Sequence, residues 1–204
     1  MERSTRFTRR AGMALAALVA VTAAVAVTFY VRGHRAAPEI PDYMQGLGGD
    51  FTLDSAAGAL RLSGFRGDLV LLYFGYTHCP DACPLALGKM AAVIRSLPAD
   101  DRGRVHGLFV SLDPRRDTPQ ILARYVRFYD PAFVGVTGRP EALKDIAARW
   151  RISYSVPAHP KDMNYTVQHS TFIYLVNAEG KAVALFGDTT PVATMRHDIE
   201  AWLP

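Results

Sequence analysis

Apolar residues along the chain fall into runs and periodic stretches that predict alternating strands and helices. Continuous apolar runs between turn signals indicate buried strands, whereas apolar positions three and four residues apart indicate helices. The predicted strands are 51–54, 59–62, 69–74, 105–112, 133–136, 170–176 and 182–186. The predicted helices are 84–97, 118–129, 140–150 and 191–203. This order predicts a three-layer α/β domain in which helices flank a central sheet.

The first part of the chain has a different pattern. Residues 11–31 contain no ionisable side chain, and as a helix they would span ~30 Å, the thickness of a bilayer's hydrocarbon core. Four arginines precede this run and two follow it closely, so the positive-inside bias predicts a cytoplasmic N-terminus. We expect a basic cytoplasmic segment (1–10), a transmembrane helix (11–31), a linker (32–48) and a folded domain (49–204). The domain would then lie on the periplasmic side of a bacterial-type inner membrane.

A cleaved signal peptide is the alternative interpretation of this segment. The small residues Ala24-Val25-Ala26 fit a cleavage site, and Arg9-Arg10 can be read as a twin-arginine signal. The apolar run continues, however, to the aromatic pair Phe29-Tyr30, which suits an interfacial anchor and favours an uncleaved helix. Both interpretations export the domain, so the functional argument does not depend on the choice.

Composition and charge exclude two classes of protein. A chain of 204 residues that is 50% hydrophobic and 21% charged is not disordered, and it suits one domain with an appendage. The formal net charge is +4, but residues 1–35 hold six arginines and one acid, which gives +5. The other 169 residues carry 17 basic and 18 acidic side chains. The domain is therefore nearly neutral, and we expect no nucleic-acid partner.

Both cysteines of the chain, Cys79 and Cys83, lie directly after the predicted strand 69–74. A domain of this size needs no structural disulfide, and a bridge across three residues would constrain the unfolded chain little. Because Pro84 lacks an amide hydrogen, we expect a helix to begin at about residue 83 or 84. Positive partial charge at a helix N-terminus lowers the pKa of a thiol, so the pair is predicted to be reactive.

The spacing of the cysteines leaves two chemistries open. A Cys-x-x-Cys pair would indicate a thioredoxin-type redox site, but here three residues intervene. The wider loop is compatible with a disulfide and with two thiolates sharing one metal, and it modestly favours chelation. Since two thiolates leave a metal under-coordinated, a third ligand is expected elsewhere in the chain.

Four segments in order carry a resemblance to a known family. They are GYTHCPDACP (75–84), VSLDPRRDTP (110–119), GVTG (135–138) and QHS (168–170). Over roughly residues 45–204 the chain resembles the SCO/SenC family of membrane-anchored copper proteins that help to assemble cytochrome c oxidase. The resemblance implies a thioredoxin-like fold and a copper site made by Cys79, Cys83 and His169. Family members commonly have Asp before that histidine, whereas this chain has Gln168, a change that leaves the ligand itself in place.

The chemistry of the implied ligands agrees with copper. Two soft thiolates and one imidazole bind Cu(I) better than a hard cation, and they can also hold Cu(II). Ligands from two separate loops would lie at the carboxyl edge of the sheet, where open α/β sheets place their sites.

Two functions from different classes follow. The first is a copper chaperone, not an enzyme, that takes one copper ion from a donor protein and delivers it to the copper-accepting subunit of cytochrome c oxidase. The second is a membrane-anchored thiol-disulfide oxidoreductase that maintains the redox state of the recipient's copper-ligand cysteines. In it Cys79 attacks and Cys83 resolves, and a thiol-disulfide reductant is an expected partner. A peroxidase on the same scaffold is disfavoured because neither the cysteine spacing nor a basic activator near Cys79 supports it.

Residues near the motifs have ordinary structural interpretations. His78 is expected to point away from the site because neighbours along an extended segment face different sides. Asp113 either orients a ligand or forms a turn with Pro114. Asp117 or Thr118 is predicted to cap the helix that follows.

Four further side chains are predicted to lie on the surface. Arg115 and Arg116 are expected to face solvent, with docking of an acidic partner as the alternative. His159 and Met163 are interpreted as surface residues, with transient copper contacts as the alternative.

Overall fold

The computed structural model describes residues 19–23, 38–157 and 162–203. The predicted cytoplasmic segment 1–10 lies outside these residues, and so does the predicted transmembrane segment 11–31 except for 19–23, which are helical. None of the helices in the described ranges has both the length and the apolar character that a membrane crossing requires. The chain forms two compact units, Met1–Ala37 and Pro38–Pro204, and the second carries the fold described below.

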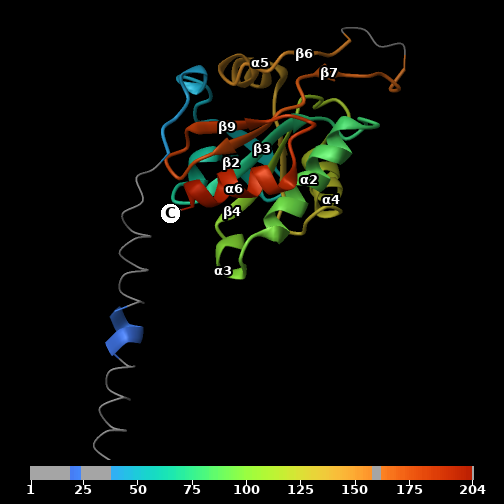
Figure 1. Ribbon diagram of the computed structural model, residues 1–204. Helices are drawn as coiled ribbons and strands as arrows, with labels where there is room; N and C mark the ends of the chain where they lie inside the picture. The colour runs from blue at the N-terminus through green and yellow to red at the C-terminus, as the bar shows by residue number, and fades with distance from the viewer. Residues whose placement is uncertain (1–18, 24–37, 158–161, 204) are drawn as a thin grey trace, which may run out of the picture. The chain divides into compact units, whose positions relative to one another are not determined.

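A seven-stranded mixed sheet forms the centre of this unit (Figure 1). Its strands are β1 (Thr52–Ser55), β2 (Gly58–Arg61), β3 (Leu69–Gly75), β4 (Val105–Ser111), β5 (Val134–Thr137), β8 (Ile173–Val176) and β9 (Ala182–Phe186). They follow the order β2-β1-β5-β4-β3-β8-β9. β3, β4 and β5 are parallel, and the outer strands pair antiparallel. A separate two-stranded sheet joins β6 (Tyr154–Ser155) to β7 (Gln168–His169).

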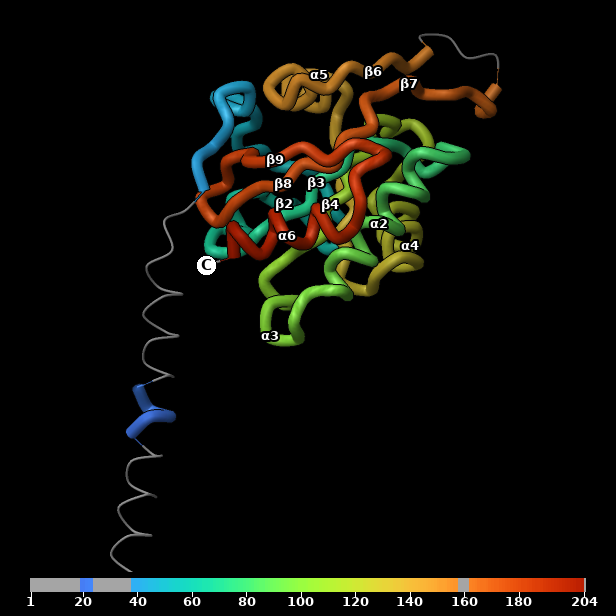
Figure 2. The backbone as a smooth tube through the Cα atoms, in the orientation of Figure 1, coloured from blue at the N-terminus to red at the C-terminus, as the bar shows by residue number. Residues whose placement is uncertain are grey.

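Helices cover both faces of the large sheet. The helices are α2 (Ala82–Ser96), α3 (Ala99–Arg102), α4 (Pro119–Arg127), α5 (Pro140–Arg149) and α6 (Val192–Trp202), with 3₁₀ turns η1 (Asp42–Met44) and η2 (Leu62–Phe65). Figures 1 and 2 show α2, α4 and α6 on one side, where they share one hydrophobic core, and α5 on the other. The predicted three-layer α/β architecture is confirmed.

The burial of β3 explains why its sequence is apolar at every position. Leu69, Leu71 and Tyr73 pack into the core beneath α2, α4 and α6. Val70, Leu72 and Phe74 pack into the opposite core, beneath α5. Because successive side chains of a strand point to opposite faces, a strand covered on both faces must be apolar throughout.

Most element boundaries differ from the predicted ones by one or two residues, and two of the differences lie near the cysteines and His169. The expected strand 170–176 begins only at Ile173, as β8, and a separate short strand that was not predicted, β7, precedes it and pairs with β6. α2 begins at Ala82, one or two residues before the predicted start at residue 83 or 84. Pro84 is compatible with this start because the first amides of a helix have no partner within the helix.

Part of the predicted linker 32–48 packs on the domain. Met44 and Leu47 are buried in the same core as α5. Gly48 has φ of +99°, and a Cβ at this position would lie 3.1 Å from the ring of Trp150. The glycine therefore permits both the left-handed backbone and the close approach of the indole.

Two glycine substitutions are expected to have opposite effects on stability. In Gly107→Ala the new methyl group would overlap the Phe133 ring, which should lower the free energy of unfolding by about 1–3 kcal/mol. In Gly88→Ala no atom beyond the backbone of the surrounding helical turns lies within 4 Å of the new Cβ. The gain in helix propensity should raise the free energy of unfolding by about 0.5–1 kcal/mol. Urea unfolding of the two variants measures both effects, and equal midpoints would contradict the packing around Gly107.

Candidate metal centre

Cys79, Cys83 and His169 meet at the carboxyl edge of the parallel strands. Cys79 lies in the loop after β3, Cys83 in the first turn of α2, and His169 in β7. One ligand atom from each residue lies within 4.8 Å of the other two. The Cys83 sulfur is 3.6 Å from Nε2 of His169, although 86 residues separate them in the chain. The structure therefore brings together the three residues that the sequence singled out.

A buried carboxylate holds the loop that carries Cys79. Asp117 accepts hydrogen bonds from the Thr77 amide at 2.8 Å, from the Ser111 hydroxyl at 2.6 Å and from the Thr77 hydroxyl. The Cys83 amide in turn donates to the Cys79 sulfur at 3.4 Å. A buried carboxylate requires hydrogen-bond partners, and Asp117 finds two of them in Thr77. The carboxylate therefore fixes the loop at Thr77, two residues before Cys79.

Gly75 gives the Cys83 sulfur its place above the end of β3. A Cβ at position 75 would lie 2.5 Å from this sulfur, which is well inside contact distance. Cys83 is fully buried and Cys79 only partly so. A metal held between the two sulfurs would therefore be reached from the Cys79 side.

The orientation of the His169 ring suits a metal ligand. Nδ1 lies 2.9 Å from the carbonyl oxygen of Ser170, and because a carbonyl only accepts, Nδ1 carries the hydrogen. In the neutral ring Nε2 then keeps its lone pair, which faces the Cys83 sulfur. The ring packs edge-to-face against Tyr73, with centroids 6.1 Å apart, and against Tyr76 at 5.8 Å.

The two thiols have opposite electrostatic environments. A hydrogen bond from Cys83 lowers the pKa of Cys79 to about 4, with help from the backbone amides of Cys83 and Asp81 and against the effect of burial. That same hydrogen bond, together with burial, raises the pKa of Cys83 far above its usual range. The helix N-terminus thus acts on Cys79, through the Cys83 amide, rather than on Cys83 itself. At neutral pH Cys79 is a thiolate and Cys83 is a thiol.

The neighbouring motif residues occupy different places. His78 has an exposed side chain, whose Nδ1 contacts the Thr77 hydroxyl at 3.0 Å, and it lies outside the Cys-Cys-His group. The Thr118 hydroxyl caps α4 by accepting a hydrogen bond from the Ile121 amide. Asp117 is not the cap, because its carboxylate is buried against Thr77.

Gln168 has an exposed side chain, and its backbone pairs with Ser155 of β6.

Arg116 contradicts the expectation that both arginines face solvent. Arg115 is exposed, but the Arg116 side chain is buried and forms an ion pair with Asp113. The sequence pattern gave no sign of this because the covering residues, such as Tyr165, are about fifty positions away. Asp113 also forms the expected turn, since its carbonyl accepts hydrogen bonds from the Arg116 and Asp117 amides.

Met163 is exposed as expected, and His159 lies outside the described residues.

The sequence predicted no role at the site for the two aromatic residues around the imidazole, Tyr73 and Tyr76. Tyr73 and Tyr76 sit where β3 ends, so their position directly before the cysteines was the available signal. Burial raises the pKa of the Tyr73 hydroxyl above its usual range, and the nearby sulfurs of Cys83 and Cys79 add to this effect. The Tyr73 hydroxyl therefore stays protonated beside the thiols.

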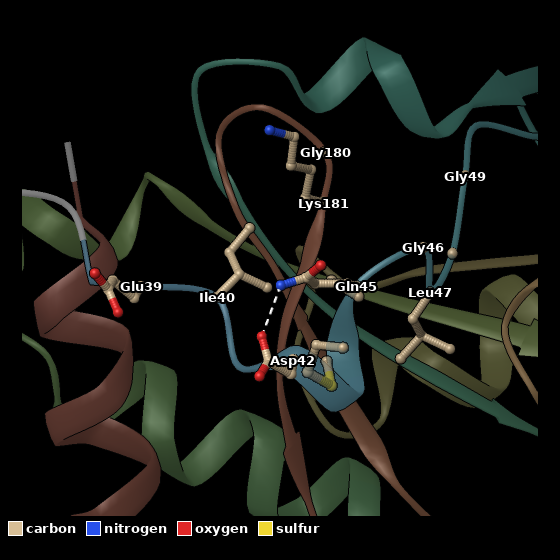
Figure 3. Close-up of a pocket in the computed structure, with 12 residues that line it drawn as sticks. Glu39, Ile40, Asp42, Gln45, Gly46, Leu47, Gly49, Gly180 and Lys181 are labelled. Carbon is tan, nitrogen blue, oxygen red and sulfur yellow. Dashed lines mark hydrogen bonds between the residues drawn. The ribbon is translucent and has the colours of Figure 1, made fainter.

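A cavity of about 770 Å³ lies elsewhere in the domain (Figure 3). It is bounded by the segment around η1 and by the turn between β8 and β9, and Asp42 accepts a hydrogen bond from Gln45 in its wall. The strand register puts this turn at the amino end of β3, whereas the cysteines follow its carboxyl end. No cysteine or histidine lines it, so this hollow is not part of the thiol and imidazole group.

The comparison with known sequences identifies relatives across most of the chain. A family model described as SCO1/SenC matches residues 41–204. Protein sco1 of Schizosaccharomyces pombe is 41% identical over 144 residues, which cover 69% of this chain and 55% of that protein. The chain spans about half the length of that protein and of the SCO2 proteins of Bos taurus and Saccharomyces cerevisiae.

Solved structures share the architecture. ScoI of Bradyrhizobium japonicum with copper bound is 33% identical, with a TM-score of 0.69 over 77% of this chain and 99% of that chain. ScoI of Arabidopsis thaliana with copper bound is 35% identical, with a TM-score of 0.69 over 76% of this chain and 97% of that chain. These likenesses confirm the thioredoxin-like α/β fold.

The lowered pKa of Cys79 predicts alkylation under acidic conditions. Iodoacetamide should modify Cys79 in the reduced protein at a nearly constant rate from pH 7 down to pH 5. The rate should fall to half near pH 4, where the thiolate takes up its proton. Replacing the main hydrogen-bond donor in Cys83→Ala should move this half-rate point upward. Mass spectrometry across a pH series, with circular dichroism to monitor folding, measures the profile, and a wild-type midpoint above pH 7 would contradict it.

Proposed function

The chain belongs to the SCO1/SenC family, and from that membership we propose that its folded domain is a copper chaperone. It binds one copper ion through Cys79, Cys83 and His169 and delivers the ion to the copper centre of cytochrome c oxidase during assembly. Copper-bound relatives of the same fold and the description of Sco proteins as cytochrome c oxidase assembly proteins support this function.

The observation that carries the proposal is the convergence of two sulfurs and one imidazole nitrogen within 4.8 Å. Soft thiolates with one imidazole select Cu(I), and they also hold Cu(II), over hard cations. Binding requires Cys83 to lose its proton, whereas Cys79 is already ionised, so one proton leaves as the ion is taken up. Three ligands leave one side of the ion open, which permits transfer by ligand exchange.

The location of the protein is part of the same proposal. Residues 11–31 anchor the chain in the membrane, the basic segment 1–10 stays in the cytoplasm, and the copper domain from residue 49 onward faces outward beyond the linker 32–48. A copper donor protein and the copper-accepting oxidase subunit meet the domain on that outer face.

Thiol-disulfide exchange is the second candidate, and the opposite pKa shifts of the two thiols favour it. The exposed edge of Cys79 is a thiolate that can attack a disulfide of a recipient, releasing one recipient thiolate and forming a mixed disulfide. Cys83 then loses its proton and attacks the Cys79 sulfur, which releases the second recipient thiolate. The recipient gains two electrons and the domain becomes the disulfide, which a separate dithiol reductant must restore.

Copper binding is tested by anaerobic titration of the reduced protein with Cu(I). We expect one ion per chain, with mixed sulfur and nitrogen ligation in X-ray absorption. His169→Ala should lower the Cu(I) affinity by more than the 10–100-fold, roughly, that follows when a ligand only loses its hydrogen-bond partner. The two thiols should remain oxidisable. His78→Ala is the matched control and should bind as the wild type does. Unchanged affinity in His169→Ala would remove that residue from the site.

Mixed-disulfide trapping separates the second function from the first. In Cys83→Ser the resolving sulfur is absent, so a recipient peptide containing a disulfide should stay bound to Cys79 and be released by reductant. His169→Ala should resolve the adduct at nearly the wild-type rate, because exchange does not use the imidazole. Absence of any adduct in Cys83→Ser, detected by non-reducing gels and mass spectrometry, would exclude exchange with that peptide.

A further inference from the structure

Arg116 is the centre of a set of buried contacts that lie outside the three proposed ligands. Its side chain is 3% exposed. Nε donates to the Asp113 carboxylate, and Nη1 donates to the carbonyls of Met163 at 3.0 Å and Tyr165 at 2.8 Å. The guanidinium carbon lies 3.6 Å from the centroid of the Tyr165 ring. One side chain thus ties residues 163–165 to the turn between β4 and α4.

Asp113 completes this arrangement from the other side. The Tyr165 hydroxyl donates to Asp113 at 2.7 Å, and the carboxylate also pairs with Arg116. Each of the three side chains, Asp113, Arg116 and Tyr165, therefore contacts the other two. Charge-assisted hydrogen bonds in such a connected group strengthen one another, so removing the charged member, Arg116, weakens the contacts of the other two.

The segment held in this way leads directly to His169. Tyr165 is four residues before the imidazole, and the β6–β7 pairing secures the other end of the segment at Tyr154 and Ser155. Arg116 also lies 5.5 Å from the ring of Tyr76, and the His169 ring packs edge-to-face on that same tyrosine. Arg116 therefore contacts residues 163–165, which lead into β7. It also lies beside Tyr76, the ring on which the imidazole packs.

We infer that Arg116 is a positioning residue for His169, which holds residues 163–169 so that Nε2 faces the two sulfurs. The inference rests on the proposed copper function, because it assigns to Arg116 an effect on copper affinity that passes through His169. Lysine cannot replace it, since three acceptors in different directions require the planar fork of a guanidinium. A lysine ammonium that pairs with Asp113 would leave the carbonyls of residues 163 and 165 without their donor.

The experiment is a double-mutant cycle between Arg116→Lys and His169→Ala in the full chain, with Cu(I) affinity measured by competition against a chelator. In the otherwise wild-type chain Arg116→Lys should lower affinity about 10–100-fold. In the His169→Ala background the same change should alter affinity less than twofold, because the residue through which it acts is absent. Arg115→Lys, at the exposed neighbouring position, is the matched control and should change nothing in either background.

A readout without copper accompanies the cycle. Amide hydrogen exchange of residues 163–169 should be faster in Arg116→Lys than in the wild type or in Arg115→Lys, while exchange in β3 stays the same. If the lysine variant does not fold, Tyr165→Phe replaces it, since it removes only the hydroxyl bond to Asp113. It should produce a smaller loss of affinity that again disappears in the His169→Ala background.

The outcomes distinguish the inference from the function on which it rests. Affinity within twofold of wild type in Arg116→Lys, or an equal loss in both backgrounds, overturns the positioning role while copper binding stands. If the wild-type protein retains no copper, the proposed function fails. The hydrogen-exchange comparison then decides alone whether Arg116 holds the segment, and unchanged exchange rates overturn it.

Discussion

Two buried carboxylates in one turn hold the two parts of the candidate site together. Asp117 binds the loop that carries Cys79, through the amide and hydroxyl of Thr77. Asp113, with Arg116, binds the segment that leads to His169. Both carboxylates are inaccessible to water, so the protein itself must supply their hydrogen bonds. The geometry of the thiols and the imidazole therefore depends on the turn 113–117, which lies between the end of β4 and the start of α4.

The central sheet makes this arrangement possible because its parallel strands end at one edge. β3 delivers the cysteine loop and the adjacent β4 delivers the turn of Asp113 and Asp117. His169 comes from farther along the chain, and the small β6–β7 sheet holds it near this edge. Open α/β sheets place their sites at such an edge because loops from separate strands meet there.

The two thiols differ in pKa, and this difference bears on both candidate functions. The hydrogen bond from Cys83 to Cys79 lowers one pKa and raises the other, which gives a ready thiolate at the accessible position and a protonated partner beneath it. A thiolate of this kind is both a metal ligand and a nucleophile. His169 separates the functions, since copper needs a third donor and disulfide exchange does not.

The sequence by itself determined the layered α/β order, the two-sided burial of β3 and the placement of the cysteines at a helix start. These features are local, because periodicity and proline position record them within a few residues. Family resemblance, rather than local pattern, pointed to His169. Only the tertiary structure decided which way its ring faces, that β6 pairs with β7, and that Arg116 is buried while Arg115 is exposed. Each of these depends on a contact between distant residues, and such a contact leaves no periodic trace in the chain.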